Sequence, residues 1–240
     1  MHRKTLFVAG SLLAMSTPVI AADLARAPLK APAAVAAAYS WTGFYIGAHG
    51  GGGWNKFTGT DPTTPGDPAS AANGSGAVAG GQIGANYQVG QVVLGVEGTY
   101  AWSDIKVSDG GPFGGGTGLT VTLKNDYLAT AAARLGYAFD RVLVYGKGGA
   151  AFTRDKLNAN NGLPGALAGS ATGSFDRTGW VAGAGVEWAF LQNWSLKAEY
   201  NYMRFGSITE VPTTVGNLAA SPAVVKLDVQ TAVVGINYRF

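Results

Sequence analysis

The C-terminal residues 225–240 show a pattern that the rest of the chain repeats. From Ala232 to Phe240 every second residue is apolar or aromatic, and the residues between them are mostly small or polar. This period of two predicts a β-strand with one apolar face and one polar face. A terminal strand of this kind would leave an exposed edge, and closure into a barrel removes that edge. The pattern therefore predicts the last strand of a closed barrel, with lipid outside and a polar lumen inside.

Seven earlier segments repeat this alternation, so the chain predicts an all-β fold: an eight-stranded antiparallel up-and-down transmembrane β-barrel. The fifth segment fits the pattern least well, because Tyr145 shares the face of Lys147. The predicted strands are residues 41–54, 78–88, 92–103, 123–138, 142–152, 178–190, 194–205 and 225–240.

The connections between these segments alternate between long and short, which fixes the topology. The long ones are rich in Gly, Ser, Thr, Asn and Pro and cover residues 55–76, 104–122, 153–177 and 206–223. The short ones are residues 89–91, 139–141 and 191–193. Outer-membrane barrels have short periplasmic turns and longer external loops. We therefore expect four external loops, with both chain ends on the periplasmic side.

Aromatic residues near the ends of the segments favour a membrane barrel over a soluble one. Tyr and Trp collect where a membrane meets water, and a soluble barrel has no reason to place them on its apolar face. The residues expected in these interfacial girdles are Trp41, Tyr87, Trp102, Tyr137, Trp180, Trp188 and Trp194.

The N-terminal residues 1–21 have the features of a secretory signal peptide. His2, Arg3 and Lys4 form a positive end, which is followed by an apolar run and then by a cleavage region of small residues. Cleavage is expected after Ala21 or Ala22. The alternative is a membrane anchor helix, but the apolar run is shorter than the roughly 20 residues that a spanning helix needs.

Residues 22–40 are rich in Ala and Pro and predict an extended periplasmic linker, with a short helix at residues 33–38 as the alternative. Residues 41–240 are then the outer-membrane barrel.

Composition narrows the function further. The 240 residues include 37 Gly and only 13% charged residues. The chain has no Cys, and this excludes a disulfide framework and thiol chemistry. The formal charge of +3 includes Arg3 and Lys4, and without them 15 basic residues face 14 acidic ones. The mature chain is therefore near neutral and has no basic run, so we do not expect it to bind nucleic acid.

Charged residues fall on the predicted lumen face of several strands. Three carboxylates and three cations inside a narrow barrel should pair, because an unpaired buried charge is costly. Eight strands also leave an interior that side chains can just fill. We expect a lumen closed by ion pairs, with a narrow ion path or acid–base catalysis as alternatives. The residues are Glu97, Arg134, Lys147, Glu187, Lys197 and Glu199.

Catalytic and metal chemistry have little support in the pattern. His49 is the one histidine that remains after signal-peptide removal, and no Ser or carboxylate has a diagnostic spacing to it. A metal site is not expected without Cys or a second His. The glycine runs at residues 50–53 and 114–116 do not lead into the Lys-Ser/Thr helix of a phosphate loop.

Four motifs carry a family resemblance: YSWTGFYIG at residues 39–47, ARLGYAF at 133–139, WSLKAEY at 194–200 and GINYRF at 235–240. With them the mature chain resembles the small outer-membrane β-barrel surface proteins of alphaproteobacteria, within the opacity-protein and OmpA-like eight-strand group. The ending, with Gly235, Tyr238 and Phe240, resembles the signal read by the barrel assembly machinery. Val233 departs from it, because a polar residue is often found there.

The resemblance implies a non-enzymatic surface antigen of the cell envelope, sometimes placed in a porin family. Implied partners are the barrel assembly machinery, outer-membrane lipid and lipopolysaccharide. No cofactor is expected, although some relatives bind haem through an exposed loop. The loops here contain no His or Cys. Three alternatives stay open: a narrow porin, a haem-binding surface receptor, and a lipid-modifying enzyme built around His49. Fold-level likeness does not decide between them.

Overall fold

The computed structural model describes residues 39–60, 70–108, 120–160, 170–208, 214–215, 218–219 and 224–240. The predicted signal peptide and all of the linker except residues 39 and 40 lie outside this range. In the part of the chain that is described, no helix is long and apolar enough to cross a membrane.

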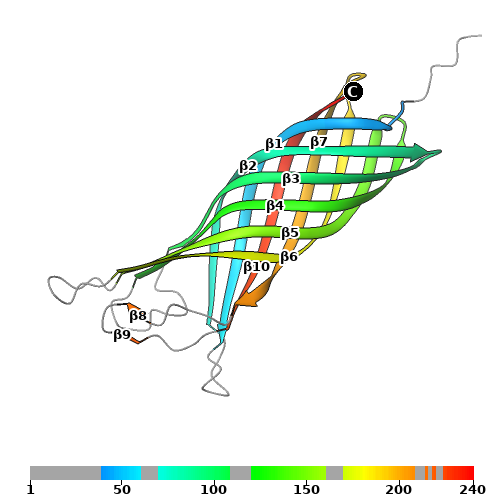
Figure 1. Cartoon of the computed structure of the whole chain (residues 1–240). Helices are drawn as coiled ribbons and strands as arrows, with labels where there is room; N and C mark the ends of the chain where they lie inside the picture. The colour runs from blue at the N-terminus through cyan, green and yellow to red at the C-terminus, as the bar shows by residue number, and fades with distance from the viewer. Residues whose placement is uncertain are drawn as a thin grey trace, which may run out of the picture. The chain divides into compact units, whose positions relative to one another are not determined.

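Eight strands form one closed antiparallel barrel, so the predicted fold class is confirmed (Figure 1). Going round the wall the order is β1-β10-β7-β6-β5-β4-β3-β2, and the first strand closes the barrel by pairing with the last. This junction runs from Tyr45 opposite Arg239 to Thr60 opposite Val224. The barrel strands are β1 (Gly43–Thr60), β2 (Ser70–Val89), β3 (Val92–Ser108), β4 (Thr120–Phe139), β5 (Val142–Asn160), β6 (Ser170–Ala189), β7 (Trp194–Ile208) and β10 (Val224–Arg239).

The barrel has a turn end and a loop end. At the turn end, tight connections join β2 to β3, β4 to β5 and β6 to β7, and the C-terminus lies at the same end (Figure 1). Gly90 and Asp140 adopt positive φ values of 61° and 52° in two of these turns, a conformation that Gly and Asp tolerate best. The loop end carries the four long connections. A separate two-stranded sheet, β8 (Thr214–Val215) with β9 (Leu218–Ala219), lies within the fourth of them.

The strands are longer than the alternation of apolar residues predicts. β5 runs to Asn160 rather than Phe152, and β6 begins at Ser170 rather than Thr178, so much of the expected third loop is strand. The other three long connections are shortened in the same way. Strand pairing needs only backbone hydrogen bonds, and where water surrounds both faces the apolar alternation disappears without ending the strand.

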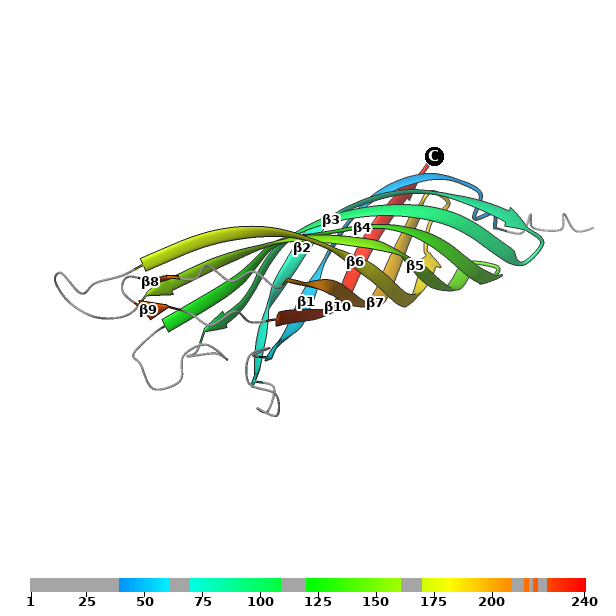
Figure 2. The same cartoon turned by 60° about the horizontal axis from the view of Figure 1, so that its bottom comes forward.

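The barrel wall divides as it approaches the loop end. Pairing between β6 and β7 stops at Gly179 opposite Phe205, so residues 170–178 of β6 pair only with β5 among the described residues. β2 and β3 part in the same way beyond Ser75 opposite Lys106. Figure 2 shows β4, β5 and β6 continuing together away from β1 and β10.

The outward face carries an apolar band between two groups of aromatic side chains. Near the turn end, Tyr137 lies against Phe139 and Trp194 against Tyr238. Towards the loop end, Tyr100 lies against Trp102 and Tyr127, and Trp180 lies against Tyr202. Exposed aliphatic side chains lie between the groups: Ile83, Leu94, Val96, Leu135, Val144, Val186, Leu196, Val234 and Ile236. This distribution is typical of a lipid-facing surface.

Glycine allows the inner wall to bend at several positions. A Cβ atom at Gly149 would lie 2.1 Å from the carbonyl oxygen of Ala131 on β4, and one at Gly179 would lie 2.1 Å from that of Arg204 on β7. Real Cβ atoms do not approach a carbonyl so closely, so the neighbouring strands could not keep this curvature with a larger residue.

Candidate functional site

The most distinctive constellation is a layer of charged side chains that crosses the lumen, here called the charged layer. It comes from five consecutive strands of the wall, and every member lies at an inward-facing position. Each of these side chains is at most 2% exposed. Its members are Glu97 on β3, Arg134 on β4, Lys147 on β5, Glu187 on β6, and Lys197 and Glu199 on β7.

Arg134 joins the two sides of the charged layer. Its Nη2 donates to Glu187 Oε2 at 2.9 Å, and its Nη1 lies 3.3 Å from Glu97 Oε2. The guanidinium carbon also lies 3.9 Å from the centre of the Tyr145 ring, so the cation stacks on an aromatic face. Arg134 therefore contacts β3, β5 and β6 at once.

The two lysines complete the pairing. Lys147 Nζ lies 2.7 Å from Glu199 Oε1 and 3.2 Å from Glu97 Oε1. Lys197 Nζ lies 3.2 Å from Glu97 Oε2 and 3.6 Å from Glu199 Oε2. Each carboxylate of the layer thus has at least one cation in contact, which is the condition for burying charge in a barrel without large cost.

Neutral hydroxyl and amide groups donate further hydrogen bonds to the carboxylate oxygens of the charged layer. Tyr145 Oη donates to Glu199 Oε2 at 2.7 Å, and Tyr45 Oη donates to Glu97 Oε2 at 3.0 Å. Ser195 Oγ and Asn237 Nδ2 donate to Glu187 Oε1 at 2.6 and 2.9 Å. Through Tyr45 and Asn237 the network reaches β1 and β10, so it crosses the junction where the barrel closes.

The turn end of the lumen is filled by Tyr39 and Trp41, which precede β1. Trp41 is 0% exposed, and its indole Nε1 donates to the backbone oxygen of Asp140 at 2.9 Å. Its backbone N donates to Gln88 Oε1 at 2.7 Å, and that of Tyr39 donates to Asp140 Oδ1 at 3.1 Å. We call Tyr39 and Trp41, together with Arg239, the turn-end plug.

Arg239 links the turn-end plug to the charged layer. Its Nη1 donates to Tyr39 Oη at 2.8 Å and to the Ser40 backbone oxygen at 3.1 Å. Its guanidinium carbon lies 4.5 Å from the Trp41 ring centre, and its Nη2 lies 3.8 Å from Glu187 Oε1. Burial raises the pKa of Tyr39, although the positive charge of Arg239 opposes the shift, so the Tyr39 hydroxyl stays protonated.

Two further layers close the lumen towards the loop end. The first is apolar: Phe57, Val78, Ile105, Leu128, Ala132, Ala151, Val181, Met203, Phe205, Leu227, Val229 and Val233. Beyond it, Asn55 Nδ2 donates to Asn125 Oδ1 at 2.7 Å, and Asn125 Nδ2 donates to Asp155 Oδ1 at 2.5 Å. Arg177 Nε lies 2.7 Å from Asp155 Oδ2. The lumen therefore alternates between polar and apolar fillings.

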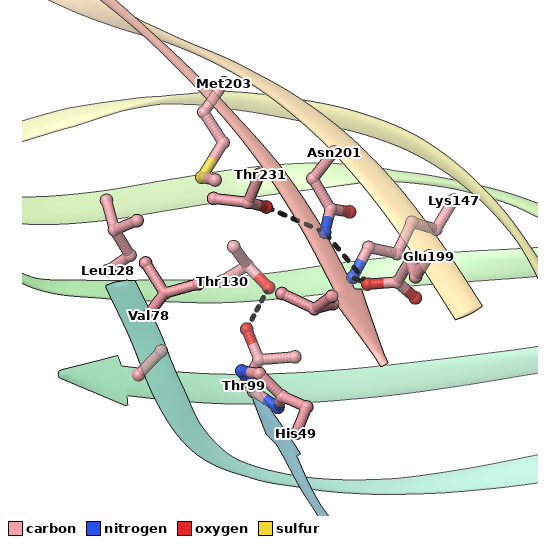
Figure 3. Close-up of a pocket in the computed structure, with 12 residues that line it drawn as sticks. His49, Val78, Thr99, Leu128, Thr130, Lys147, Glu199, Asn201, Met203 and Thr231 are labelled. Carbon is pink, nitrogen blue, oxygen red and sulfur yellow. Dashed lines mark hydrogen bonds and ion pairs between the residues drawn. The ribbon is translucent and has the colours of Figure 1, made fainter. Parts of the chain in front are cut away.

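One small cavity lies between the charged layer and the apolar layer (Figure 3). Its volume is about 30 Å³, enough for one or two water molecules and not for a solute. Lys147 and Glu199 meet at one side of it, and Thr99 Oγ1 and Thr130 Oγ1 bond to each other at 2.7 Å at another (Figure 3).

His49 also borders this cavity, inside the barrel. Its Nδ1 lies 2.6 Å from Gln82 Oε1, and Gln82 Nε2 donates to Asn237 Oδ1 at 2.7 Å. A hydrolytic site would need a Ser and a carboxylate arranged about the imidazole, whereas the polar partner of His49 here is an amide.

Metal binding finds no support in the same region. Across the described ranges, no three His, Asp or Glu side chains lie close enough together to share a metal ion.

The structure brings all six predicted lumen residues together, and it adds partners that the sequence analysis did not assign. Tyr45, Tyr145 and Arg239 are the main additions. A signal was present, because each shares the inward-facing parity of its strand, and Tyr145 follows the same face as Lys147. Large aromatic residues suggest lipid contact, so parity alone did not identify them as lumen residues.

Six of the seven predicted interfacial aromatic residues are exposed on the outward face of the barrel. Tyr87, Tyr137, Trp188 and Trp194 lie near the turn end, and Trp102 and Trp180 lie towards the loop end. Trp41 is the correction, because it fills the mouth of the barrel instead of facing outward. It precedes β1, where the two-residue alternation no longer decides the side-chain direction.

The three residues of the predicted assembly signal have different surroundings. Phe240 is 74% exposed, and its ring packs edge-on against Tyr238 at 5.2 Å. Gly235 faces inward, where a Cβ atom would lie 2.8 Å from the Ala48 backbone oxygen and 3.3 Å from Lys197 Cε. Gly235 therefore leaves space for the charged layer, whereas the two aromatic rings are accessible from outside.

Comparison with known proteins gives consistent matches over nearly the whole chain. The family model for the outer membrane protein beta-barrel domain matches residues 27–240. The 31 kDa outer-membrane immunogenic protein of Brucella melitensis is 34% identical, and the match covers 99% of this chain and 100% of that protein. The 22 kDa outer membrane protein of Rhizobium leguminosarum bv. viciae is 31% identical over 73% of this chain and 69% of its own length.

Among solved structures, the outer membrane protease OmpT from Escherichia coli superposes with a TM-score of 0.50 at 10% identity. The match covers 82% of this chain and 97% of OmpT. At this identity the likeness concerns the fold alone.

Proposed function

Because the chain belongs to the outer membrane protein β-barrel domain family and resides in the outer membrane, we propose that it is a structural surface protein whose lumen is closed. In this proposal the barrel contributes to the envelope, and its four loop-end connections contact the surroundings of the cell. The observation that carries the proposal is the charged layer, because its cross-strand ion pairs occupy the lumen where a pore would have to run.

The filling of the lumen supports a structural role over transport. The turn-end plug, the charged layer and the apolar layer follow one another, and the cavity between two of them holds one or two waters. General porins use about 16 to 18 strands to keep an aqueous channel, whereas eight strands enclose a space that side chains fill. A solute would have to displace several buried ion pairs.

The orientation follows from the connections. Tight turns and the C-terminus share one end of the barrel, and outer-membrane barrels place short turns in the periplasm. In our proposal the loop end therefore faces outward, and the segment before Tyr39 starts on the periplasmic side. The names of the Brucella relatives, outer-membrane immunogenic proteins, agree with loops that antibodies reach.

Assembly and lipid contact supply the proposed partners. The half-buried ring of Tyr238 and the exposed ring of Phe240, at and just after the end of β10, are accessible to the barrel assembly machinery, and the outward band is suited to outer-membrane lipid and lipopolysaccharide. No enzymatic activity is proposed, since His49 bonds to Gln82 inside the barrel. Haem binding concerns the external loops, which apart from β8 and β9 lie largely outside the described residues, and it stays a prediction.

A narrow channel is the second candidate, and one observation favours it. The small cavity has polar walls on the side of Lys147 and Glu199, so rearrangement of these side chains would open a hydrophilic path. Liposome swelling separates the candidates. A structural barrel leaves arabinose permeability at the level of empty liposomes, and a channel raises it.

Cysteine labelling tests the orientation, because the natural chain has no Cys. Asn158→Cys at the loop end should react with a membrane-impermeant maleimide on intact cells. Gln192→Cys in the β6–β7 turn should react only after the outer membrane is permeabilised. The reverse result would place the loop end in the periplasm and contradict the proposed surface role.

A further inference from the structure

A pocket opens between β1, β7 and β10 near the loop end, and of its lining residues only Phe205 also belongs to the apolar layer of the lumen. Its volume is about 310 Å³, within the range of small-molecule sites. The pocket is lined by Thr58, Arg204, Phe205, Ser207, Lys226 and Asp228. All but Phe205 are polar, and two of them are cations.

Two residues of a β-bulge between β7 and β10, Ser207 and Lys226, line this pocket. Leu227 pairs with Phe205 and Val225 pairs with Ile208, so two residues of β7, Gly206 and Ser207, face the single Lys226 of β10. A bulge redirects side chains, and bulges recur beside functional sites. Here it places the Ser207 side chain beside Lys226, opposite Thr58 on β1.

This sector of the barrel carries unpaired positive charge. Arg204 Nε lies 2.8 Å from Asp228 Oδ1, and Tyr202 Oη donates to the same oxygen at 3.0 Å, so the one carboxylate of the pocket is already neutralised. Two lysines of this sector have no acidic partner among the described residues. They are Lys226 on β10 and Lys56 on β1, and the backbone of Lys56 pairs with that of Asp228 on β10.

The opposite sector has similar cations but pairs them with acids. Lys106 lies 2.9 Å from Asp104, Lys156 lies 2.9 Å from Asp126, and Arg154 lies 2.7 Å from Asp176. Among the described residues, each cation of the opposite sector thus contacts a carboxylate, whereas Lys56 and Lys226 contact none.

The pocket lies at the depth of lipid head groups. Lys56 follows the exposed Trp54 by two residues on β1, and Arg204 follows Tyr202 by two on β7. Trp and Tyr mark the level where hydrocarbon meets water, so the next outward-facing residues reach the head groups.

We propose that this pocket binds a phosphate group of a phosphorylated glycolipid of the outer leaflet. Lys226 supplies the positive charge, the hydroxyls of Thr58 and Ser207 donate to phosphate oxygens, and Lys56 strengthens the local field, while the charge of Arg204 is balanced by Asp228. The adjoining apolar band, which includes Val234 and Ile236 on β10, accommodates the acyl chains. The inference rests on the proposed orientation, because only an outward loop end meets the outer leaflet.

Native mass spectrometry of the full barrel in detergent tests the site, with bisphosphorylated lipid A as the probe. The double variant Lys56→Gln/Lys226→Gln should weaken binding by about 30-fold, since each lysine beside an anionic lipid surface contributes about 1 kcal/mol. Removal of the lipid A phosphates should weaken binding to the natural protein by a similar factor and leave the double variant unaffected.

The matched control is Lys106→Gln/Lys156→Gln, which removes the same charge from the sector where the lysines are paired. Its affinity should stay within about twofold of the natural protein. Equal losses in the two double variants would show charge-driven binding without a site, and no loss in either would exclude the pocket. Inorganic phosphate can be added at millimolar concentration as a competitor of lipid A. If it abolishes lipid A binding, the pocket is a site for a free anion instead of a lipid.

Failure of this inference can be told apart from failure of the proposed function. Lipid binding to the purified barrel does not depend on its orientation in the cell, which cysteine labelling measures separately. If Asn158→Cys is labelled on intact cells but Lys56 and Lys226 do not affect lipid A binding, the phosphate site is wrong and the surface role stands.

Discussion

Arg134 on β4 and Glu187 on β6 are 53 residues apart in the chain, and their side chains meet inside the barrel at 2.9 Å. β5 separates the two strands in the wall, so this contact does not belong to the sheet ladder. It ties strands that share no backbone hydrogen bond. The charged layer therefore acts as an internal brace as well as a filling of the lumen.

Arg134→Met should lower the free energy of unfolding by about 3–5 kcal/mol, because it takes from the buried Glu187 its close cation and leaves it only Arg239 at 3.8 Å. Guanidinium unfolding of the barrel from lipid vesicles, followed by tryptophan fluorescence, measures the change. Arg154→Met is the control. It breaks the exposed pair with Asp176 and should leave stability nearly unchanged, because solvent screens this pair.

The double variant Arg134→Met/Glu187→Gln examines the coupling directly. The double variant should lower the free energy of unfolding by less than the sum of the two single changes, since removal of the Glu187 charge eliminates the unpaired carboxylate that Arg134→Met creates. Strict additivity would mean that the two side chains do not interact across the lumen.

Trp41→Ala should destabilise the barrel by about 3–5 kcal/mol, the usual cost of emptying a buried tryptophan site. Trp102→Ala makes the same chemical change on the outward face, where the ring is 67% exposed and lipid replaces its contacts. In the same unfolding experiment, we expect Trp102→Ala to lower the free energy of unfolding by less than Trp41→Ala does. Equal losses would show that Trp41 does not plug the turn end.

The architecture was predictable because lipid and lumen impose opposite demands on alternate residues. On β6, for example, Trp180, Val186 and Trp188 face outward, whereas Gly185 and Glu187 face inward, as the alternation predicts. The strand ends were not predictable in this way. Beyond the aromatic groups both faces of β5 carry polar or charged residues such as Arg154 and Asp155, and alternation no longer marks a strand.

The site was predictable for its charges and less so for its aromatic members. A buried Glu97 or Lys147 can only be a lumen residue, since lipid excludes charge. Tyr45 and Tyr145 are compatible with lipid or lumen, and only the bonds to Glu97 and Glu199 show why they face inward. The pocket at Lys226 depends on a bulge, which arises from the pairing of β7 with β10 and has no signature in either strand alone.

Gly149→Ala should prevent folding or sharply reduce the yield of folded barrel, because the new methyl group would lie 2.1 Å from the Ala131 carbonyl oxygen. Gly148→Ala is a neighbouring control on the outward face, where the nearest atom to a Cβ, the Val181 backbone oxygen, would lie 3.8 Å away. The measurement is the heat-modifiable gel shift of the folded barrel. If both variants fold equally well, the wall is not bent at Gly149 as described.

Deletion of Phe240 should reduce insertion into the outer membrane, as expected if its exposed ring forms part of the assembly signal. Deletion of residues 30–38, which precede the turn-end plug, should leave insertion unchanged. Membrane fractionation with the heat-modifiable shift measures both. Normal insertion without Phe240 would remove the terminus from the proposed signal.

Planar-bilayer recording of the purified natural protein tests the closed lumen most directly. The account predicts a bilayer without stable unitary openings at either polarity, because the ion pairs around Arg134 and Glu97 occupy the path. Stable openings whose conductance or ion selectivity changes with Glu97→Gln or Arg134→Met would contradict it and assign the protein to the narrow channels.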